Sequence, residues 1–400
     1  MNNNQTNFAV ISHILPPSPS GQAMVLYRLL QRISPNKYCL ISRVNYQSIK
    51  NISNDSSKLP AEYYHLDSGF QLTRPNRFKL YYLRIFINAL IGIINRAKKI
   101  TLIMKNENCR ILIACSGDLY DIPSAWLASK WLKISLVVYL FDDYAYQWIG
   151  AERIVAKWLE PKVLNHAHSV IVTNEFMEQE YLDRYGLKTR IIRNLCYIPY
   201  LKEIDESDSI FNRKTVNIVY TGAIYHANHD AFRNLIAAIK KLNKSKIILH
   251  LYTAQSESSL RSEGIISNMI VIHKHINQFE IPEVLRQADV LFLPLAFESK
   301  IEEVIKTSAP GKMGDYLSSG RPILVHAPGD SFVSWYFKNN NCGLVVDKND
   351  TQLLFRALKR IISDKKLQKS IGINARVRAE KDFNQDSIQS EFIRLLESIS

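Results

Sequence analysis

The chain has 400 residues, of which 46% are hydrophobic and 22% charged. This composition excludes wholesale disorder and supplies enough apolar residues for buried cores. A single core rarely grows past about 250–300 residues, so we expect two domains. The 51 Lys and Arg outnumber the 37 Asp and Glu, and the resulting net charge of +14 favours an anionic partner such as nucleic acid, an acidic membrane or a phosphorylated substrate.

The sequence also bears on the compartment. The amino terminus is polar and has no signal-peptide pattern. The most apolar stretch, 80–94, contains Arg84 and Asn88 and is shorter than the roughly 20 residues of a spanning helix. We therefore expect a cytoplasmic protein, with peripheral attachment to the inner face of the cell membrane as a further option. Five scattered cysteines without a CxxC pair favour a reducing compartment and argue against a disulfide framework or zinc site: Cys39, Cys109, Cys115, Cys196 and Cys342.

Short apolar runs alternate with longer amphipathic ones through the first half of the chain. The runs that predict strands are 8–14, 38–42, 110–115, 136–141, 169–173 and 189–192. The patterns that predict helices between them are 22–33, 121–132, 151–167 and 174–185. Near-continuous apolar strands separated by helices are typical of a parallel sheet that is covered on both faces.

The same alternation restarts in the second half. Strands are predicted at 216–221, 247–252, 290–293, 322–326 and 343–346. We therefore predict an α/β protein with two doubly wound parallel-sheet domains that face each other. Their predicted limits are 1–200 and 215–380, with a polar linker at 201–214 and a C-terminal helix at 381–400 that packs back toward the first domain.

Two loops of the first half contain residues suited to chemistry. The first strand is followed by a proline-rich loop from His13 to Gly21, where backbone N–H groups at a helix start can approach an anion. A proline-stiffened turn is the alternative. Asp142 and Asp143 follow the apolar run 136–141 and can hold a metal or act as a general base. Alternatively, one of them caps a helix and the other lies in solvent.

The second half has its own candidates. Gly222 ends the first strand there, which predicts close approach of the backbone to a ligand. Thr307 and Ser308 lie in a polar loop before a helix predicted at 311–319, where they can donate to a diphosphate. Lys312 adds positive charge, and Asp315 can accept two ribose hydroxyls from about the same helix face. A capped surface helix with an ordinary Lys–Asp pair is the alternative.

The stretch TSAPGKMGDYLSSGRPIL (307–324) resembles the donor-loop motif of GT-B glycosyltransferases, in particular family 4. The runs 288–294 and 342–346 resemble the strands on either side of that motif, and 172–174 and 191–194 resemble first-domain segments of the same fold. The resemblance implies two Rossmann-like domains across a cleft. It also implies a UDP- or GDP-linked sugar that lies between the domains and is held mainly by the second, an acceptor on the first, and hexosyl transfer without a metal or other cofactor.

The chain departs from the family pattern at two points. Of the family's two glutamates, the second aligns with Asp315 and the first with Thr307, which has no carboxylate. The Arg and Lys that usually clamp the diphosphate are not evident at 225–229, which leaves Lys312 or Arg321 as substitutes. For acceptor activation the first-domain candidates are His13, whose ordinary pKa suits a base, and the Asp142–Asp143 pair.

Other functions compete with transfer to a glycan or lipid-linked acceptor. A GT-B sugar-nucleotide epimerase would bind the same ligand but need no acceptor. A dinucleotide-dependent dehydrogenase is disfavoured because no GxGxxG follows the first strand. A metal-dependent transferase would need more than a single Asp-Asp pair. A non-enzymatic nucleic-acid binder would explain the charge, but no binding motif organises the basic residues, so we expect no nucleic-acid partner.

Residues 71–110 are a candidate membrane segment. They contain nine Lys and Arg and one acid, Glu107, interleaved with large apolar side chains. A helix of this composition can press its apolar stripe into a bilayer while its cations meet anionic headgroups. The alternative is a domain helix whose apolar stripe faces the sheet and whose cations are solvated. Arg96, Lys98 and Lys99 are the cations expected to matter for membrane binding.

Overall fold

The structure is a computed structural model that describes residues 7–46, 48, 57–67, 72–73, 78–200, 209–242, 246–274 and 276–399. The chain divides into two compact units. The first comprises Met1–Arg193 and Asp386–Ser400, and the second comprises Asn194–Gln385. Of the predicted linker 201–214, residues 201–208 lie outside the described part, and the predicted domain limits stay a prediction.

The first unit is built on a seven-stranded sheet with the order β3-β2-β1-β4-β5-β6-β7, in which every pairing is parallel. Its strands are β1 (Phe8–Ile11), β2 (Tyr38–Ser42), β3 (Glu62–His65), β4 (Ile111–Cys115), β5 (Ser135–Leu140), β6 (Ser169–Val172) and β7 (Arg190–Ile191). Because the order reverses between β1 and β4, the loops after these two strands form the switch point where ligands bind in such sheets.

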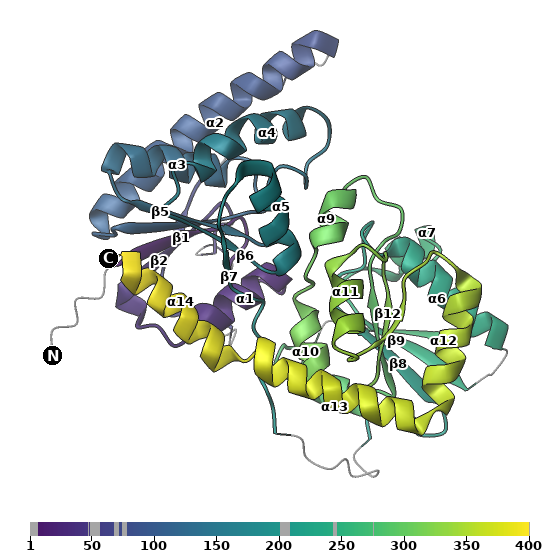
Figure 1. Ribbon diagram of the computed structural model, residues 1–400. Coiled ribbons are helices and arrows are strands. Elements are labelled where there is room, and N and C mark those ends of the chain that lie inside the picture. Colours follow the sequence, from purple (N-terminus) through teal and green to yellow (C-terminus); the bar gives the residue numbers. More distant parts are fainter. Residues whose placement is uncertain are drawn as a thin grey trace. The chain divides into compact units, whose positions relative to one another are not determined.

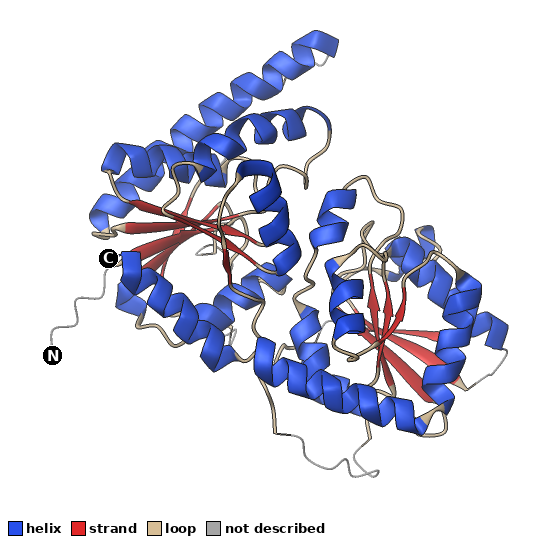
Figure 2. Ribbon diagram, in the orientation of Figure 1, coloured by secondary structure: helices blue, strands red, loops and turns tan. Residues whose placement is uncertain are grey.

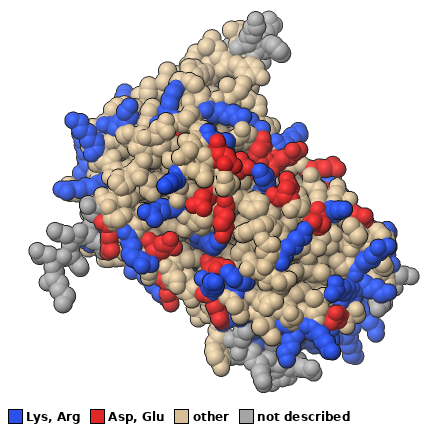
Figure 3. Space-filling view, viewed as in Figure 1, with Lys and Arg blue, Asp and Glu red and all other residues tan. Residues whose placement is uncertain are grey.

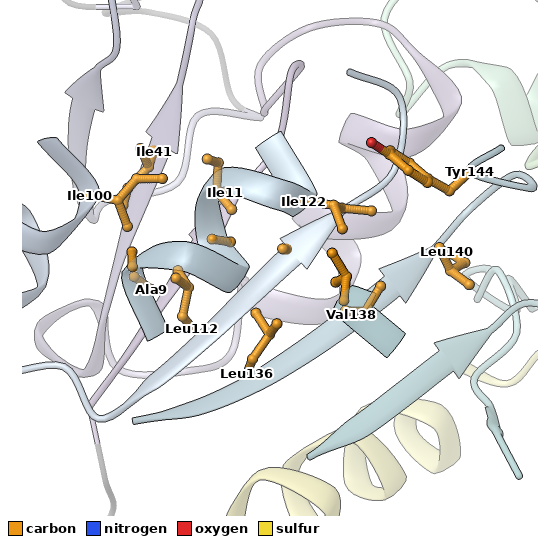
Figure 4. Packing of buried hydrophobic residues seen from close by; sticks show 14 of the residues in the cluster. Ala9, Ile11, Ile41, Ile100, Leu112, Ile122, Leu136, Val138, Leu140 and Tyr144 are labelled. Carbon is orange, nitrogen blue, oxygen red and sulfur yellow. The ribbon is translucent and has the colours of Figure 1, made fainter. Parts of the chain in front are cut away.

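Helices cover both faces of this sheet (Figures 1 and 2). They are α1 (Gly21–Leu30), α2 (Phe78–Asn106), α3 (Asp121–Leu132), α4 (Gly150–Leu164), α5 (Glu175–Tyr185) and α14 (Gln385–Ile399), with a short 3-10 turn η1 (Pro35–Lys37). The helices α2, α3 and α4 pack against one another. Apolar side chains from the central strands fill the space below them, and Figure 4 shows the packing of Ala9, Leu112, Leu136 and Val138.

The second unit repeats the architecture with a six-stranded parallel sheet in the order β10-β9-β8-β11-β12-β13. Its strands are β8 (Val216–Thr221), β9 (Ile247–Tyr252), β10 (Ile270–His273), β11 (Val290–Pro294), β12 (Ile323–His326) and β13 (Leu344–Val346). The switch point here lies between β8 and β11. Two doubly wound Rossmann-like sheets confirm the predicted fold class.

The helices of the second unit complete its layers. They are α6 (His229–Leu242), α7 (Glu257–Ser262), α8 (Ile281–Gln287), α9 (Glu302–Thr307), α10 (Lys312–Ser318), α11 (Phe332–Asn339), α12 (Thr351–Ser363) and α13 (Lys365–Asp382). The amphipathic helices α6 and α12 pack together over the core, and α10 packs against α13. Over the described residues, no helix combines the length and apolarity needed to span a bilayer.

Candidate active site

His13 and Gly117 meet at the switch point of the first unit. His13 follows β1, and Gly117 follows β4 with a φ of +117°, a conformation that favours glycine. A Cβ added to Gly117 would lie 2.2 Å from Cε1 of His13 and 2.3 Å from its Nδ1. The backbone after β4 therefore passes against the imidazole, and only a glycine leaves the ring its place.

Hydrogen bonds connect the loops around His13. The side-chain amide of Gln22, in the first turn of α1, donates to Ser12 Oγ and to the carbonyl of Ser116, each at 3.0 Å. Ser116 Oγ in turn accepts from the backbone N–H groups of Phe141 and Asp142, at 2.9 and 3.2 Å. The loops after β1, β4 and β5 are thereby fixed to one another, which positions His13 and Asp142 on a rigid edge.

The environment of His13 suits a base. Burial lowers its pKa below the usual 6.5, and the Asp118 carboxylate and a hydrogen bond to the backbone of Ser116 oppose this shift only in part. The imidazole is therefore mainly neutral at neutral pH. Its Nδ1 is buried without a hydrogen-bond partner among the described residues. A buried nitrogen of this kind can accept a proton or a hydrogen bond from a ligand.

The two adjacent aspartates have different environments. Asp143 is buried, accepts from the N–H groups of Ala145 and Tyr146 at 3.1 and 3.0 Å, and pairs with Arg184. These contacts give Asp143 a structural role in the turn after β5. Asp142 is exposed to solvent, although desolvation by the dense protein around it and the Asp143 charge raise its pKa to about 6. Asp142 is thus the member of the pair that could exchange a proton with a ligand.

Gly21 begins α1 and is exposed. A Cβ built there meets nothing within 4 Å, so no contact within the protein demands a glycine. Ser20 caps the helix by accepting from the N–H of Ala23. The predicted anion contact at this helix start stays a prediction.

In the second unit, Gly222, Lys312 and Tyr220 come together at the carboxyl end of β8. Gly222 has a φ of +116°, and a Cβ there would lie 3.0 Å from Cε and 3.1 Å from Nζ of Lys312. The Lys312 ammonium donates to the Tyr220 hydroxyl at 2.8 Å and lies 4.3 Å from the centre of the Tyr220 ring. The two predicted residues thus occupy one small region, although they are ninety positions apart in sequence.

The charge of Lys312 is poorly compensated within the protein. Desolvation lowers its pKa to about 7, and no ion pair to it forms among the described residues. The hydroxyl of Tyr316, one helical turn further on, instead accepts from the N–H of Thr221 at 2.9 Å and joins α10 to β8. A lysine that is held rigidly beside a strand end without a carboxylate is well placed to meet an anionic ligand.

Three further predicted residues lie near this region in sequence. Thr307 is not in a loop before α10: it is the last residue of α9, is buried, and donates its hydroxyl to the carbonyl of Glu303 at 3.0 Å. The prediction that Thr307 lies in a polar loop is therefore wrong, because α9 extends through it. Ser308 follows at the C-cap, and Asp315 lies half-buried in α10. Their predicted roles in donor binding stay predictions.

Arg321 lies at the other end of the sheet. It precedes β12, and its Nε donates to the carbonyl of Ala288 at 2.5 Å, just before β11. The amino ends of parallel strands lie opposite the switch point, so Arg321 does not reach the region of Gly222. Lys312 and Arg321 were the two candidates to replace the Arg and Lys that usually hold the diphosphate. The geometry favours Lys312.

Sequence reasoning missed Gly117, Asp118 and Tyr220. A glycine and an aspartate directly after the strand 110–115 were a usable signal, because they match the Gly222 position in the other half. Tyr220 is one of several buried residues in β8, and nothing in the sequence distinguishes it from a core residue.

A cavity of 390 Å³, lined in part by Asn36, Glu62 and Cys109, opens at the amino ends of the first unit's strands, away from the switch point. Over the described residues no cluster of three or more His, Cys, Asp or Glu could hold a metal.

Residues 215–364 match the family model for glycosyl transferases group 1. No curated protein matches the chain. The fold resembles that of sucrose-phosphate synthase from Thermosynechococcus elongatus, with 16% identity, a TM-score of 0.71, and coverage of 98% of this chain and 99% of that one. It also resembles Anabaena Alr3699/HepE in complex with UDP-glucose, with 14% identity, a TM-score of 0.70, and coverage of 98% and 100%.

The chain contains a glycosyl transferases group 1 domain and has the fold of GT-B glycosyltransferases. Its second unit carries the glycosyl transferases group 1 domain, and both units have the Rossmann-like sheets of that fold. A third similar structure, from Listeria monocytogenes and named for UDP-N-acetylglucosamine 2-epimerase, has 11% identity and a TM-score of 0.60 and covers 98% of this chain and 96% of that one. At this identity the likeness to each structure concerns the fold.

Proposed function

We propose that this glycosyltransferase takes a hexosyl group from a UDP- or GDP-linked sugar, without a metal, and transfers it to a lipid-linked or polysaccharide-precursor glycan at the cytoplasmic face of a membrane. The observation that carries the donor assignment is the Lys312 ammonium fixed against Gly222 at the switch point of the second unit. The motif resemblance, and the UDP-glucose complex of the HepE protein, support a nucleotide sugar as the donor.

Departure of the diphosphate is the step that most needs the second unit. The bond between the anomeric carbon and the diphosphate oxygen breaks, and its electron pair remains on the diphosphate. A positioned ammonium stabilises that charge as it develops, with no reorganisation at the moment of reaction. Lys312 supplies the cation, and the backbone at Gly222 lets the phosphates approach closely. Asp315 is the carboxylate proposed for the ribose hydroxyls.

The first unit supplies the acceptor side in this proposal. The acceptor hydroxyl oxygen forms the new bond to the anomeric carbon, and its proton passes to a base. His13, with a lowered pKa and an unpartnered buried Nδ1, is our first candidate for that base. Asp142 is the second, because its carboxylate is exposed and its raised pKa allows it to take up a proton near neutral pH.

A panel of nucleotide sugars screened by thermal stabilisation tests the donor assignment, because a ligand that binds only the folded state raises its stability. We expect UDP- or GDP-sugars to stabilise the wild type and to lose most of that effect in Lys312→Met. Asp315→Asn should weaken binding by about 1–3 kcal/mol if its carboxylate accepts ribose hydroxyls. Stabilisation that is equal in wild type and Lys312→Met would contradict the donor site.

Product analysis then separates transfer from epimerisation. Incubation of the stabilising sugar nucleotide with the enzyme alone should leave the sugar configuration unchanged. Release of nucleotide should depend on an added glycan or lipid-linked acceptor. An epimerised sugar nucleotide formed without any acceptor would identify the enzyme as an epimerase instead.

A further inference from the structure

The helix α2 has two halves with different surroundings. Its C-terminal half buries a stripe of apolar side chains at helical spacing, namely Ala89, Ile93, Ala97, Ile100 and Met104. This half behaves as an ordinary domain helix that packs on the sheet. The half before Ala89 projects beyond the body of the first unit, as Figure 1 shows. Residues 71 and 74–77 of the predicted membrane segment lie outside the described part of the chain.

Large apolar side chains stay exposed on the projecting half. Leu83, Phe86 and Leu90 are 53%, 42% and 52% exposed and follow one another at spacings of three and four, which places them on one helix face. The neighbouring helix α4 adds Ile154 and Trp158, which are 60% and 51% exposed. The rings of Phe86 and Trp158 meet edge to face with their centres 5.6 Å apart. These five residues form one continuous surface, which we call the α2–α4 face.

The charges around the α2–α4 face are mainly basic. No acidic residue occurs anywhere in α2. In α4, Glu160 is buried and accepts hydrogen bonds from two tyrosines, which leaves Glu152 as the only other acid of that helix. Exposed Lys157 and Lys162 flank Trp158, and the Lys162 ammonium lies over the Trp158 ring, 3.0 Å from its centre. Figure 3 shows a largely uncharged surface just below the grey tip at the upper end of the view, with both basic and acidic side chains further down.

Two of the three cations expected to matter for membrane binding, Arg96 and Lys99, pair with carboxylates of the protein instead. Arg96 is buried and pairs with Asp118 and Asp121, so it belongs to the core of the unit. Lys99 pairs with Asp67. Only Lys98 among the three is exposed without a carboxylate partner within the described residues. The C-terminal half of α2 is therefore not the candidate membrane surface. The exposed apolar residues of its N-terminal half, together with those of α4, are the better candidate.

We propose that the α2–α4 face docks the first unit on an anionic lipid bilayer. Its apolar side chains would enter the boundary between headgroups and acyl chains, and Lys157 and Lys162 would meet the lipid phosphates and carboxylates. An exposed apolar patch that contains tryptophan and is bordered by cations is typical of a surface that binds a partner, and its charges complement an anionic bilayer. The proposal adds a surface to the proposed lipid-linked acceptor but does not depend on glycosyl transfer.

Sedimentation of the full-length protein with lipid vesicles tests the docking surface. We expect binding to phosphatidylcholine vesicles that contain phosphatidylglycerol, little binding to pure phosphatidylcholine, and weakening at high salt. Lys157→Glu/Lys162→Glu and Leu83→Ser/Leu90→Ser should each reduce the partition coefficient by roughly tenfold or more. These side chains are exposed, so circular dichroism and melting temperature should stay close to those of the wild type.

Matched control variants lie on α13 of the second unit. Ile373 and Val377 are exposed at the same i, i+4 spacing as Ile154 and Trp158, and Lys366 and Lys369 are exposed lysines. Ile373→Ser/Val377→Ser and Lys366→Glu/Lys369→Glu should retain wild-type vesicle binding. Equal loss in test and control variants, or binding that ignores anionic lipid, would overturn the proposal.

A second copy of the chain is the other occupant that this face could accept. Light scattering without vesicles would then show a dimer that Leu83→Ser/Leu90→Ser converts to a monomer, and the membrane proposal would be wrong. Nucleotide-sugar stabilisation of the same samples reports on the proposed function separately. Lost vesicle binding with retained nucleotide binding would leave the glycosyltransferase assignment intact.

Discussion

Lys312 links donor binding to pH at the scale of a single residue. Its pKa in the free protein is lowered to about 7, and an anionic ligand stabilises the charged form. Below pH 7 the ammonium is already present, whereas above it the ligand has to draw a proton onto the side chain. We therefore expect the Kd for the donor sugar nucleotide to be constant below about pH 7 and to rise by up to about tenfold per pH unit above it.

Calorimetric titration between pH 6 and 9 measures this dependence. A nucleotide sugar is the suitable ligand because it has no terminal phosphate monoester with a pKa near 6. Lys312→Arg keeps a charge at every pH tested and should give a flat profile with much of the affinity retained. Lys312→Met should be flat and weak. A wild-type profile parallel to that of Lys312→Met would show that Lys312 does not contact the diphosphate.

Gly117 makes a second prediction at this scale. An alanine there needs a φ near +117°, a strain of about 1–3 kcal/mol, and its Cβ would displace the His13 ring. Gly117→Ala should therefore lower the melting temperature modestly and reduce turnover strongly, while nucleotide-sugar stabilisation of the second unit persists. His13→Ala separates the two effects, because it should reduce turnover without the backbone strain. Full activity in both variants would remove His13 from the mechanism.

At the scale of elements, the alternation of apolar runs predicted the central strands and most helices to within a few residues. The strands β3 and β10 were missed. Both are edge strands with exposed or half-buried positions: β3 (EYYH) has no apolar run, whereas β10 overlaps the short apolar run 269–272, for which no strand was predicted. The helix α9 was not predicted, and its last two residues were placed in a polar loop, because its six residues begin with two glutamates and stand alone between loops. The contact of Lys312 with Gly222 depends on how β8 and α10 pack against each other. A local sequence pattern does not predict such packing.

The buried ion pairs of α2 give a prediction for a whole element. Arg96 is 3% exposed and holds two buried carboxylates, Asp118 and Asp121, between α2 and the start of α3. Burial and the Asp118 charge raise the pKa of Asp121 to about 7 even with the arginine present. Arg96→Met should cost about 3–5 kcal/mol, because it leaves the buried Asp121 carboxylate without a cation and leaves Asp118 with only Arg43, which pairs with it at 2.9 Å.

Thermal unfolding followed by circular dichroism checks this cost. Lys98→Met, two residues away on the exposed face of the same helix, is the matched control and should be within about 0.5 kcal/mol of wild type. Loss of the arginine raises the pKa of Asp121 above its wild-type value of about 7, so the destabilisation of Arg96→Met should be largest at alkaline pH and shrink as the pH falls to about 7, where Asp121 is protonated in the variant. A loss that is independent of pH would indicate lost packing only.

At the scale of the whole molecule, the chain enters and leaves the second unit once, because residues 386–400 belong to the first unit. The helix α14 buries Ile388, Phe392 and Leu396. Its Gln389 amide donates to the carbonyls of Arg28 and Leu29 at the end of α1, where backbone carbonyls run out of helical partners. An amphipathic last helix was evident in the sequence, but the acceptors of its buried glutamine were not.

This discontinuous arrangement predicts that the last helix stabilises one unit and leaves the other unchanged. Phe392 is 2% exposed, so Phe392→Ala should destabilise the first unit by about 3–5 kcal/mol through the cavity it creates. Differential scanning calorimetry should show an earlier transition for the first unit. The second transition, which we assign to the second unit because a nucleotide sugar should raise its temperature, should stay where it is in the wild type.

Ile373→Ala in α13, at an exposed position, is the control and should move neither transition. Limited proteolysis at an intermediate temperature should then release peptides from 1–193 first, while a fragment near 194–385 resists cleavage. A single transition that shifts as a whole in Phe392→Ala would show that the two units unfold together.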